Sequence, residues 1–250
     1  MKSLVIFAVF VASILSNPIA VNDREHEANL RRILESQRYN FPCGWPNAGE
    51  NGVPPVDPLF VEQVVIVQDS IASSLTSTIS NIFVRNLRTF VIENLEINSA
   101  ARTLRYRINI PLLTLDARHE TRGRMIGIPV VNGNGPMTSR ATNAFIEGVV
   151  TWVEQADTGF IHFDDQVANF NAQTVVVQMD GFGLLTGTIN RQINDMIPEV
   201  INDPAMQAQF NQIINDIMLP MLNEFTYQMT PPQAAEFLAF YAENIPPPNC

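Results

Sequence analysis

The sequence is short of basic residues and holds no apolar run long enough to cross a bilayer. Its 250 residues include 15 Lys+Arg against 25 Asp+Glu, which gives a formal net charge of -10. Nucleic acids and anionic bilayers both select basic surfaces, so neither is the expected partner. The leading apolar run, Leu4–Leu15, is too short for a stable membrane anchor. We therefore expect a partner that is neutral or apolar.

Histidine is also scarce, and none of the three histidines stands in a metal or catalytic motif. His26-Glu27 and His119-Glu120 begin like a zinc-protease motif, but Leu30 and Gly123 occupy the positions of the second ligand. His162 alternates with apolar neighbours, which is more typical of a solvent-facing residue at a strand end than of a catalytic residue or ligand. The sequence contains no Gly-x-Ser-x-Gly elbow and no phosphate-binding glycine loop. It predicts a protein that is not an enzyme and needs no metal or cofactor.

The first twenty residues have the three-part layout of a secretory signal peptide. Lys2 precedes the apolar run, and a region of small residues, Ser16–Ala20, follows it. Residues 1–20 are therefore predicted to be a signal peptide, and residues 21–250 a single domain that is secreted and extracellular. With 46% hydrophobic residues, such a domain can bury one large core. We expect it to be a monomer.

The chain has only two cysteines, Cys43 and Cys250. In an oxidising compartment they can form a disulfide that ties the last residue to the start of the fold. A loop of this length stabilises a fold by about 5 kcal/mol in the chain-entropy model. The alternative is two separate thiols, one of which links a second molecule.

The segment from Leu184 to Met229 has the longest helical periodicity in the chain. Its apolar residues recur at spacings of three and four, first at Leu185, Ile189, Ile193, Met196, Ile197 and Val200, and again at Phe210, Ile213, Ile214, Ile217, Met221 and Phe225. Asp203-Pro204 is typical of an N-cap followed by proline at the first helical position. The pattern predicts two successive helices or one sharply bent helix, with Pro198 and Pro220 each adding a kink or a boundary. A shorter helix capped by Asn22 or Asp23 is expected to reach about Gln37, and another is expected from Pro231.

Between these helices the hydrophobic period changes to two, which is typical of strands. The strand candidates are 60–67, 75–84, 90–97, 104–112, 124–131, 141–153, 160–163 and 174–179. The run Asn132-Gly133-Asn134-Gly135 predicts a tight turn between two of them. Strands joined by short turns, with helices only at the chain ends, favour an α+β fold with an antiparallel sheet.

Three segments resemble motifs of the insect takeout and haemolymph juvenile-hormone-binding proteins. Cys43-Gly44-Trp45-Pro46 followed by Gly52-Val53-Pro54-Pro55-Val56-Asp57-Pro58-Leu59 is similar to the entry motif of that family, glycine-isoleucine-proline and then leucine-aspartate-proline-leucine. Gly127–Gly135 is similar to its mid-sheet strand and glycine turn, and Thr188–Asn194 to the start of its long helix. The motifs have the expected order and spacing. The chain departs from the family in having one cysteine near its N-terminus, where takeout-like members usually carry a close pair.

The resemblance implies a TULIP-like fold, in which a highly curved antiparallel sheet wraps a long kinked C-terminal helix, with short helices at both chain ends. It also implies an elongated apolar tunnel that holds a lipophilic ligand, such as a juvenile hormone-like terpenoid, a fatty acid or another lipid, in insect haemolymph. The tunnel lining that we expect is Leu104, Tyr106, Ile108, Ile110, Val150, Trp152, Ile189, Ile193, Met196, Ile197, Phe210, Ile214, Ile217 and Met221. Tyr106 or Tyr227 would select a polar end group of the ligand. Periodicity alone favours a filled core, in which case the protein would be a secreted interaction protein without a ligand.

Arginines are concentrated in the sheet region. They are Arg85, Arg88, Arg102, Arg105, Arg107, Arg118, Arg122 and Arg124, whereas Arg191 is the only basic residue after Gln155. The pattern is typical of a solvated outer sheet face that discourages pairing with other chains. The alternative is a surface that docks on a receptor or membrane while the ligand is delivered.

Overall fold

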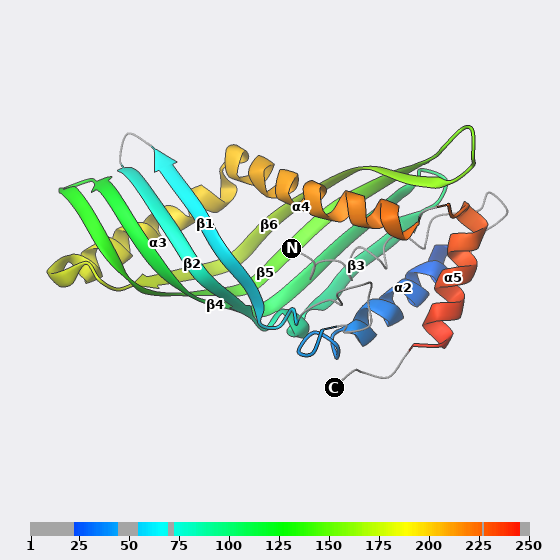
Figure 1. Ribbon diagram of the computed structural model, residues 1–250, viewed down its shortest axis with the longest axis horizontal. Coiled ribbons are helices and arrows are strands. Elements are labelled where there is room, and N and C mark those ends of the chain that lie inside the picture. Colours follow the sequence, from blue (N-terminus) through cyan, green and yellow to red (C-terminus); the bar gives the residue numbers. More distant parts are fainter. Residues whose placement is uncertain (1–22, 45–54, 70–72, 227, 246–250) are drawn as a thin grey trace.

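The computed structural model describes residues 23–44, 55–69, 73–226 and 228–245. Along the chain, α-helices precede and follow the strands of an antiparallel sheet, which confirms the predicted α+β class (Figure 1). Figure 1 shows an elongated molecule with α2 and α5 side by side at one end and α3 at the other. In chain order the elements are α2 (Asp23–Gln37), β1 (Leu59–Asp69), β2 (Ser73–Arg85), a 3-10 helix (Leu87–Thr89), β3 (Val91–Asn98), β4 (Thr103–Met125), β5 (Ile128–Glu154), β6 (Ile161–Met179), a 3-10 helix (Gly183–Leu185), α3 (Thr186–Asn202), α4 (Pro204–Phe225) and α5 (Pro231–Glu243).

The sheet has the strand order β1-β2-β4-β5-β6, and all of its pairs are antiparallel. Strand β4 is long enough to pair with two strands on one edge. Its first part, Thr103–Asn109, pairs with β3, and its second part, Thr114–Met125, pairs with β2. Strands β1 and β6 therefore form the two ends of the main path, and the sheet is open.

The predicted tight turn at Asn132–Gly135 is wrong, because these residues lie inside β5 and pair with β4. The hairpin turn lies at Ile126-Gly127, where Gly127 has a left-handed φ of 73°. The glycines of the predicted turn serve another purpose. A Cβ atom at Gly133 would lie 2.2 Å from the ring of Phe182, so a side chain is excluded there by packing. Glycine in this part of β5 makes room for the connection from β6 to α3.

The sheet bends where β4 and β5 lie side by side and each switches the set of alternate side chains that points into the interior. In β4 the buried side chains fall on even-numbered positions in the stretch 104–110 and on odd-numbered positions in the stretch 119–125. In β5 they fall on odd positions from Val131 to Ala141 and on even positions from Ala144 to Trp152. Asn143, with a φ of 45°, lies at the change and faces the Pro111–Leu112 step of β4. Breaks in the alternation bend and twist a strand, so they produce the curvature that we predicted.

The bend divides the interior into two hydrophobic cores. The first lies under α2 and α5 and includes Leu30, Leu104, Trp152, Phe163 and Leu238. The second lies under α3 and includes Ile79, Met125, Val131, Met179 and Ile189. Each core takes the even or the odd face of β4 and β5 on its own side of the bend.

The long helical segment divides as predicted at Asp203. The Asp203 Oδ1 atom accepts hydrogen bonds from the backbone N–H groups of Ala205 and Met206, at 2.8 and 3.0 Å, and so caps α4. Pro204 occupies the first position of α4, where its missing N–H costs nothing. Pro198 and Pro220 lie inside α3 and α4, so neither forms a boundary. Among the described residues, no helix has both the length and the hydropathy needed to cross a membrane.

Asp57, in the predicted entry motif, fixes the start of the sheet. Its two carboxylate oxygens accept hydrogen bonds from the backbone N–H groups of Asn86 and Arg88, at 2.8 and 3.1 Å. These groups belong to the turn between β2 and β3, so one side chain joins the segment before β1 to a turn about 30 residues later.

Candidate functional site

An apolar cavity of about 290 Å³ lies at the bend, between the concave face of the sheet and α3. Its lining is Val84, Leu113, Leu115, Ser139, Ala141, Phe170, Val175, Val177, Ile197, Val200 and Ile201. Among these described residues only Ser139 is polar. The volume is close to the lower end of the range for small-molecule sites. The cavity can therefore accept an apolar group, but it offers almost no polar chemistry.

The position of the cavity follows from the bend. Leu113 and Ala141 are inward-facing residues beside the breaks in β4 and β5, and Phe170 and Val175 flank the corresponding stretch of β6. On the helical side, Ile201 is close to the Asp203 break between α3 and α4. The helices and the sheet thus change direction at the same place, and the two cores do not meet there.

The six predicted lining residues of the sheet are brought together, but in the first core. Leu104, Tyr106, Ile108, Ile110, Val150 and Trp152 are each 0–7% exposed and pack in the cluster that α2 and α5 cover. None of them lines the cavity at the bend. Their role as ligand contacts stays a prediction.

The predicted residues of the helices are divided between the second core and the cavity. Ile189 is buried in the second core, and Ile193, Met196 and Ile197 pack against that core. Ile197 also lines the cavity. The Phe210 ring lies 6.0 Å from the ring of Phe170, which is itself a cavity residue. The side chains of Ile214, Ile217, Met221 and Tyr227 lie outside the described part of the chain.

Sequence reasoning missed the cavity residues of β4, β5 and β6. Uninterrupted alternation from Leu104 in β4 or from Val150 in β5 places the even-numbered side chains inside. It therefore assigns three inward-facing residues to the outside, Leu113, Leu115 and Ala141. A signal was available in Pro111, because proline cannot donate a ladder hydrogen bond and marks irregular positions in strands. Placing a break there would have moved the inward face to the odd positions.

The helices are fixed to the free edge of β6 by side-chain amides. On α3, Asn190 exchanges two hydrogen bonds with the main chain of Met179, at 3.0 and 3.1 Å. On α4, Asn223 does the same with Phe163 at 2.7 and 2.9 Å, and Gln207 with Phe170 at 3.3 and 2.9 Å. The amides imitate a neighbouring strand, so the edge of the sheet is satisfied and the helices are held against it.

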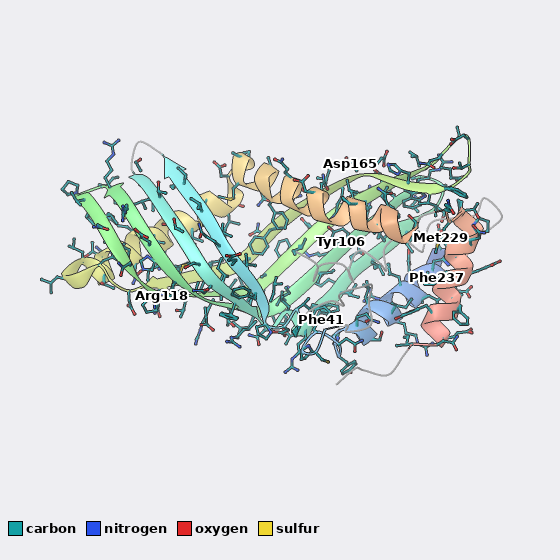
Figure 2. The ribbon with its side chains drawn as sticks, viewed as in Figure 1. Phe41, Tyr106, Arg118, Asp165, Met229 and Phe237 are labelled. Carbon is teal, nitrogen blue, oxygen red and sulfur yellow. The ribbon has the colours of Figure 1, made fainter. Side chains whose placement is uncertain are left out.

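A buried polar pair lies under this helix–sheet seam. Gln166, 1% exposed, donates a hydrogen bond from Nε2 to the Tyr106 hydroxyl at 2.7 Å. Burial raises the pKa of Tyr106 to about 12, and the hydrogen bond with Gln166 partly opposes that rise. Figure 2 labels Tyr106 on the sheet, close to the last part of α4 in that view. The phenol is therefore neutral over the whole physiological range.

His119 is a buried structural residue. Its Nε2 atom lies 2.7 Å from the main-chain oxygen of Asp180, and its Nδ1 atom lies 3.0 Å from the Thr121 hydroxyl. Because a carbonyl oxygen can only accept, Nε2 carries the proton and Nδ1 can accept from Thr121. These contacts join β4 to the connection before α3. His162 is exposed, as predicted, and no group of three His, Cys, Asp or Glu in the described ranges could hold a metal ion.

The arginines of the sheet are largely neutralised by neighbouring carboxylates. Arg107 bridges two acids, with N–O distances of 2.8 Å to Glu93 and 2.7 Å to Glu147, and lies over the Phe145 ring. Further ion pairs join Arg85 to Asp116, Arg88 to Asp57, Arg102 to Glu154 and Arg122 to Glu120. Paired charges of this kind suit a solvated face. Docking through the arginines stays a prediction.

The predictions for the two chain ends involve residues that the structure does not describe. The predicted signal peptide, residues 1–20, lies outside the described ranges, as does Cys250. Cys43 follows α2, and its Sγ atom lies 3.9 Å from the main-chain oxygen of Tyr39. The disulfide between Cys43 and Cys250 stays a prediction.

The sequence matches the family described as haemolymph juvenile hormone binding protein over residues 4–233. Among solved structures, the chain is similar to Epiphyas postvittana Takeout 1, with a TM-score of 0.52 and 15% identity, over 87% of this chain and 92% of that one. A lipopolysaccharide binding protein is matched at a TM-score of 0.38 and 10% identity, over 77% of this chain and 38% of that one. No curated protein sequence is significantly similar to the chain. The likeness to Takeout 1 confirms the predicted fold.

Proposed function

The chain belongs to the haemolymph juvenile hormone binding protein family, and from this membership we propose that it is a secreted carrier of a small lipophilic ligand. The apolar body of the ligand occupies the cavity at the bend. The observation that carries the proposal is the lining of that cavity, which is apolar except for Ser139. Apolar walls that face solvent are unfavourable, and an apolar guest that covers them removes this cost.

The edge strand β1 leaves apolar side chains uncovered on the concave side of the sheet. Val64 and Ile66 pair in register with Ile79 and Ser77 of β2, whose side chains face the concave side. Yet Val64 is 42% exposed and Ile66 is 37% exposed. Uncovered apolar side chains on the concave face favour contact of this face with an apolar partner.

The hydrophobic effect alone can supply the affinity. An extended lipophile that buries about 400 Å² of apolar surface gains roughly 10 kcal/mol on transfer from water, at about 25 cal/mol per Å². Loss of translational and rotational freedom removes a large part of this gain. Micromolar to nanomolar dissociation constants then follow from apolar contacts, and affinity depends on area and shape more than on polar recognition.

The direct test is to extract the purified protein with organic solvent. Protein secreted from eukaryotic cells should release a stoichiometric apolar compound, detected by mass spectrometry. After delipidation it should bind N-phenyl-1-naphthylamine, a neutral fluorescent probe, with one site per chain. A protein that yields no compound and ignores the probe would contradict the carrier proposal. Capture of a protein partner by such a protein would favour the alternative, a secreted interaction protein with a filled core.

A further inference from the structure

The helix–sheet seam contains one place where hydrogen bonding is incomplete. Along α4, the amides of Gln207, Asn211 and Asn223 bind main-chain groups of β6. Asn215 lies one helical turn after Asn211 and on the same side of α4. Its buried Oδ1 atom has no hydrogen-bond donor among the described residues. The regular series of amides is therefore interrupted at Asn215.

The opposite side of the seam shows the same deficiency. Asn211 contacts Ala168 and Asn223 contacts Phe163, so Asn215 faces the part of β6 between them, which contains Gln166. The Oε1 atom of Gln166 is buried and also lacks a donor within the described part of the chain. Its Nε2 atom is engaged with the Tyr106 hydroxyl, which fixes the side chain. Two acceptor oxygens thus lie in one stretch of the seam without donors.

Gly148 shows that the space around this pair is closely fitted. Gly148 faces Tyr106 across β4 and β5, and a Cβ atom added to it would lie 2.7 Å from the Tyr106 hydroxyl oxygen. Glycine at this position therefore admits the phenol, which in turn holds the Gln166 amide. The arrangement keeps Gln166 Oε1 directed away from Tyr106, buried and without a donor among the described residues.

The cavity and the polar pair lie along one face of one strand. Gln166, Ala168 and Phe170 alternate on the concave side of β6, and Phe170 lines the cavity. Four residues of a strand span about 13 Å. Ala168, between them, contributes only a methyl group to this face. Ala168 is 0% exposed and Gln166 is 1% exposed, because α4 packs on this part of β6. An extended chain seated in the cavity therefore reaches Gln166 with its end only when α4 separates from β6 at Ala168.

We propose that the ligand is a long-chain molecule with a neutral hydrogen-bond donor at one end, such as a hydroxyl group, and that Gln166 Oε1 accepts this hydrogen bond. The inference rests on the proposed carrier function. A donor is required because both unmatched atoms are acceptors, and a buried acceptor without a donor is costly. A ligand that ends in an ester, ether or epoxide offers further acceptors and leaves Gln166 unmatched. A carboxylate adds a negative charge beside two oxygen atoms, which is less favourable still.

The test compares three ligands that differ only at one end: dodecanol, dodecyl methyl ether and dodecane. Each is titrated against delipidated full-length protein loaded with N-phenyl-1-naphthylamine, and displacement of the probe gives its dissociation constant. One buried hydrogen bond should make dodecanol bind about fivefold to tenfold tighter than its methyl ether. The substitution Gln166→Met keeps the length of the side chain and removes the acceptor, so it should abolish this preference. Gln178→Met, at an exposed position of the same strand, should leave it unchanged.

A second variant guards against misfolding of the first. Tyr106→Phe removes the group that holds the Gln166 amide, and it should reduce the preference for the alcohol while probe binding remains. Equal binding of all three ligands, or tighter binding of the ether, would overturn the assignment of Gln166 and leave the carrier function standing. If no ligand displaces the probe and the probe itself does not bind, both proposals fail together.

Discussion

Asn194 on α3 binds both main-chain polar groups of Val177 on β6. The Val177 N–H donates to Asn194 Oδ1 at 2.7 Å, and Asn194 Nδ2 donates to the Val177 carbonyl oxygen at 2.8 Å. The Asn194 side chain thus takes the place of a strand that would otherwise continue the sheet. Together with Asn190, Gln207 and Asn223, it fixes α3 and α4 to the edge of β6 and so sets the width of the space at the bend.

Replacing Asn194 should therefore weaken the fold more than an ordinary polar substitution does. Asn194→Ala removes the two hydrogen bonds to Val177 and a third to the Asn190 carbonyl oxygen. It leaves the main chain of a nearly buried residue without these partners, so the free energy of unfolding should fall by about 1–3 kcal/mol. Asn202→Ala is the matched control, because within the described ranges the Asn202 amide binds Pro198 of its own helix alone, and it is exposed. Its effect should stay within about 0.5 kcal/mol. Urea unfolding measures both, and equal losses would mean that the seam does not hold the helix.

Filling the cavity with a larger side chain should lower the affinity for the ligand strongly and change the free energy of unfolding only a little. Ala141 lines the cavity, and Ala141→Phe places a ring in the space that the ligand needs. Binding of N-phenyl-1-naphthylamine should fall at least tenfold, whereas the unfolding free energy should change by no more than about 1–3 kcal/mol. Arg140→Phe adds the same ring to the neighbouring residue, which is exposed on the opposite face of β5. If both variants bind the probe equally, the ligand lies elsewhere.

The sequence indicated the helices well because their signals are local. An aspartate before Pro204 specifies a cap, and the structure places a cap there with two hydrogen bonds. The apolar spacing around Ile189 and Ile193 identifies the buried side of α3 without any knowledge of the sheet. Such signals depend on residues within a few positions of each other, so they survive whatever tertiary structure surrounds them.

The face of each long strand could not be predicted in the same way. Alternation from Leu104 to Ile110 is regular, and continuing it past Pro111 assigns Leu113 and Leu115 to the wrong side. Asn143 lies where the inward-facing side chains of β5 switch from odd to even positions, and it has a positive φ. Asparagine is common in this sequence, so Asn143 alone does not predict the switch. The location of the cavity therefore depended on a break that only the pairing of two distant segments reveals.

Acidification should weaken the attachment of α2. Both ring nitrogens of His26 are buried without a partner among the described residues, and this burial lowers its pKa below 6.5, although Asp23 and Glu25 oppose the change. The unfolded chain then binds the proton more readily than the folded chain. The contribution of His26 to stability is therefore complete above about pH 6.5 and is lost as the pH falls through the lowered pKa.

The size of this pH effect should be small, below about 1 kcal/mol, because His26 is only half buried and solvent screens it. Urea unfolding at about pH 7.5 and about pH 5.5 measures the change. The loss on acidification should be smaller in His26→Gln than in the unaltered protein, and His162→Gln, at an exposed position, should behave like the unaltered protein. A loss that is the same in all three proteins would exclude His26 as its source.

Two glycines test the correction to the predicted hairpin, because they should respond to alanine in opposite directions. A Cβ atom at Gly133 would lie 2.2 and 2.4 Å from two ring atoms of Phe182, which is 8% exposed and stacks near His119. The ring has little freedom to move, so Gly133→Ala should cost about 1–3 kcal/mol. A Cβ atom at Gly187, inside α3, would meet nothing within 4 Å among the described atoms. Since alanine favours a helix over glycine, Gly187→Ala should stabilise by up to about 1 kcal/mol.

A double variant checks the cause of the Gly133 effect. If Gly133 formed an open turn between two strands, Gly133→Ala would lose stability only because alanine disfavours the turn conformation. In that case the second change, Phe182→Leu, would not restore stability. Restoration by Phe182→Leu in a double-mutant cycle is the result expected from the packing of Phe182 against β5.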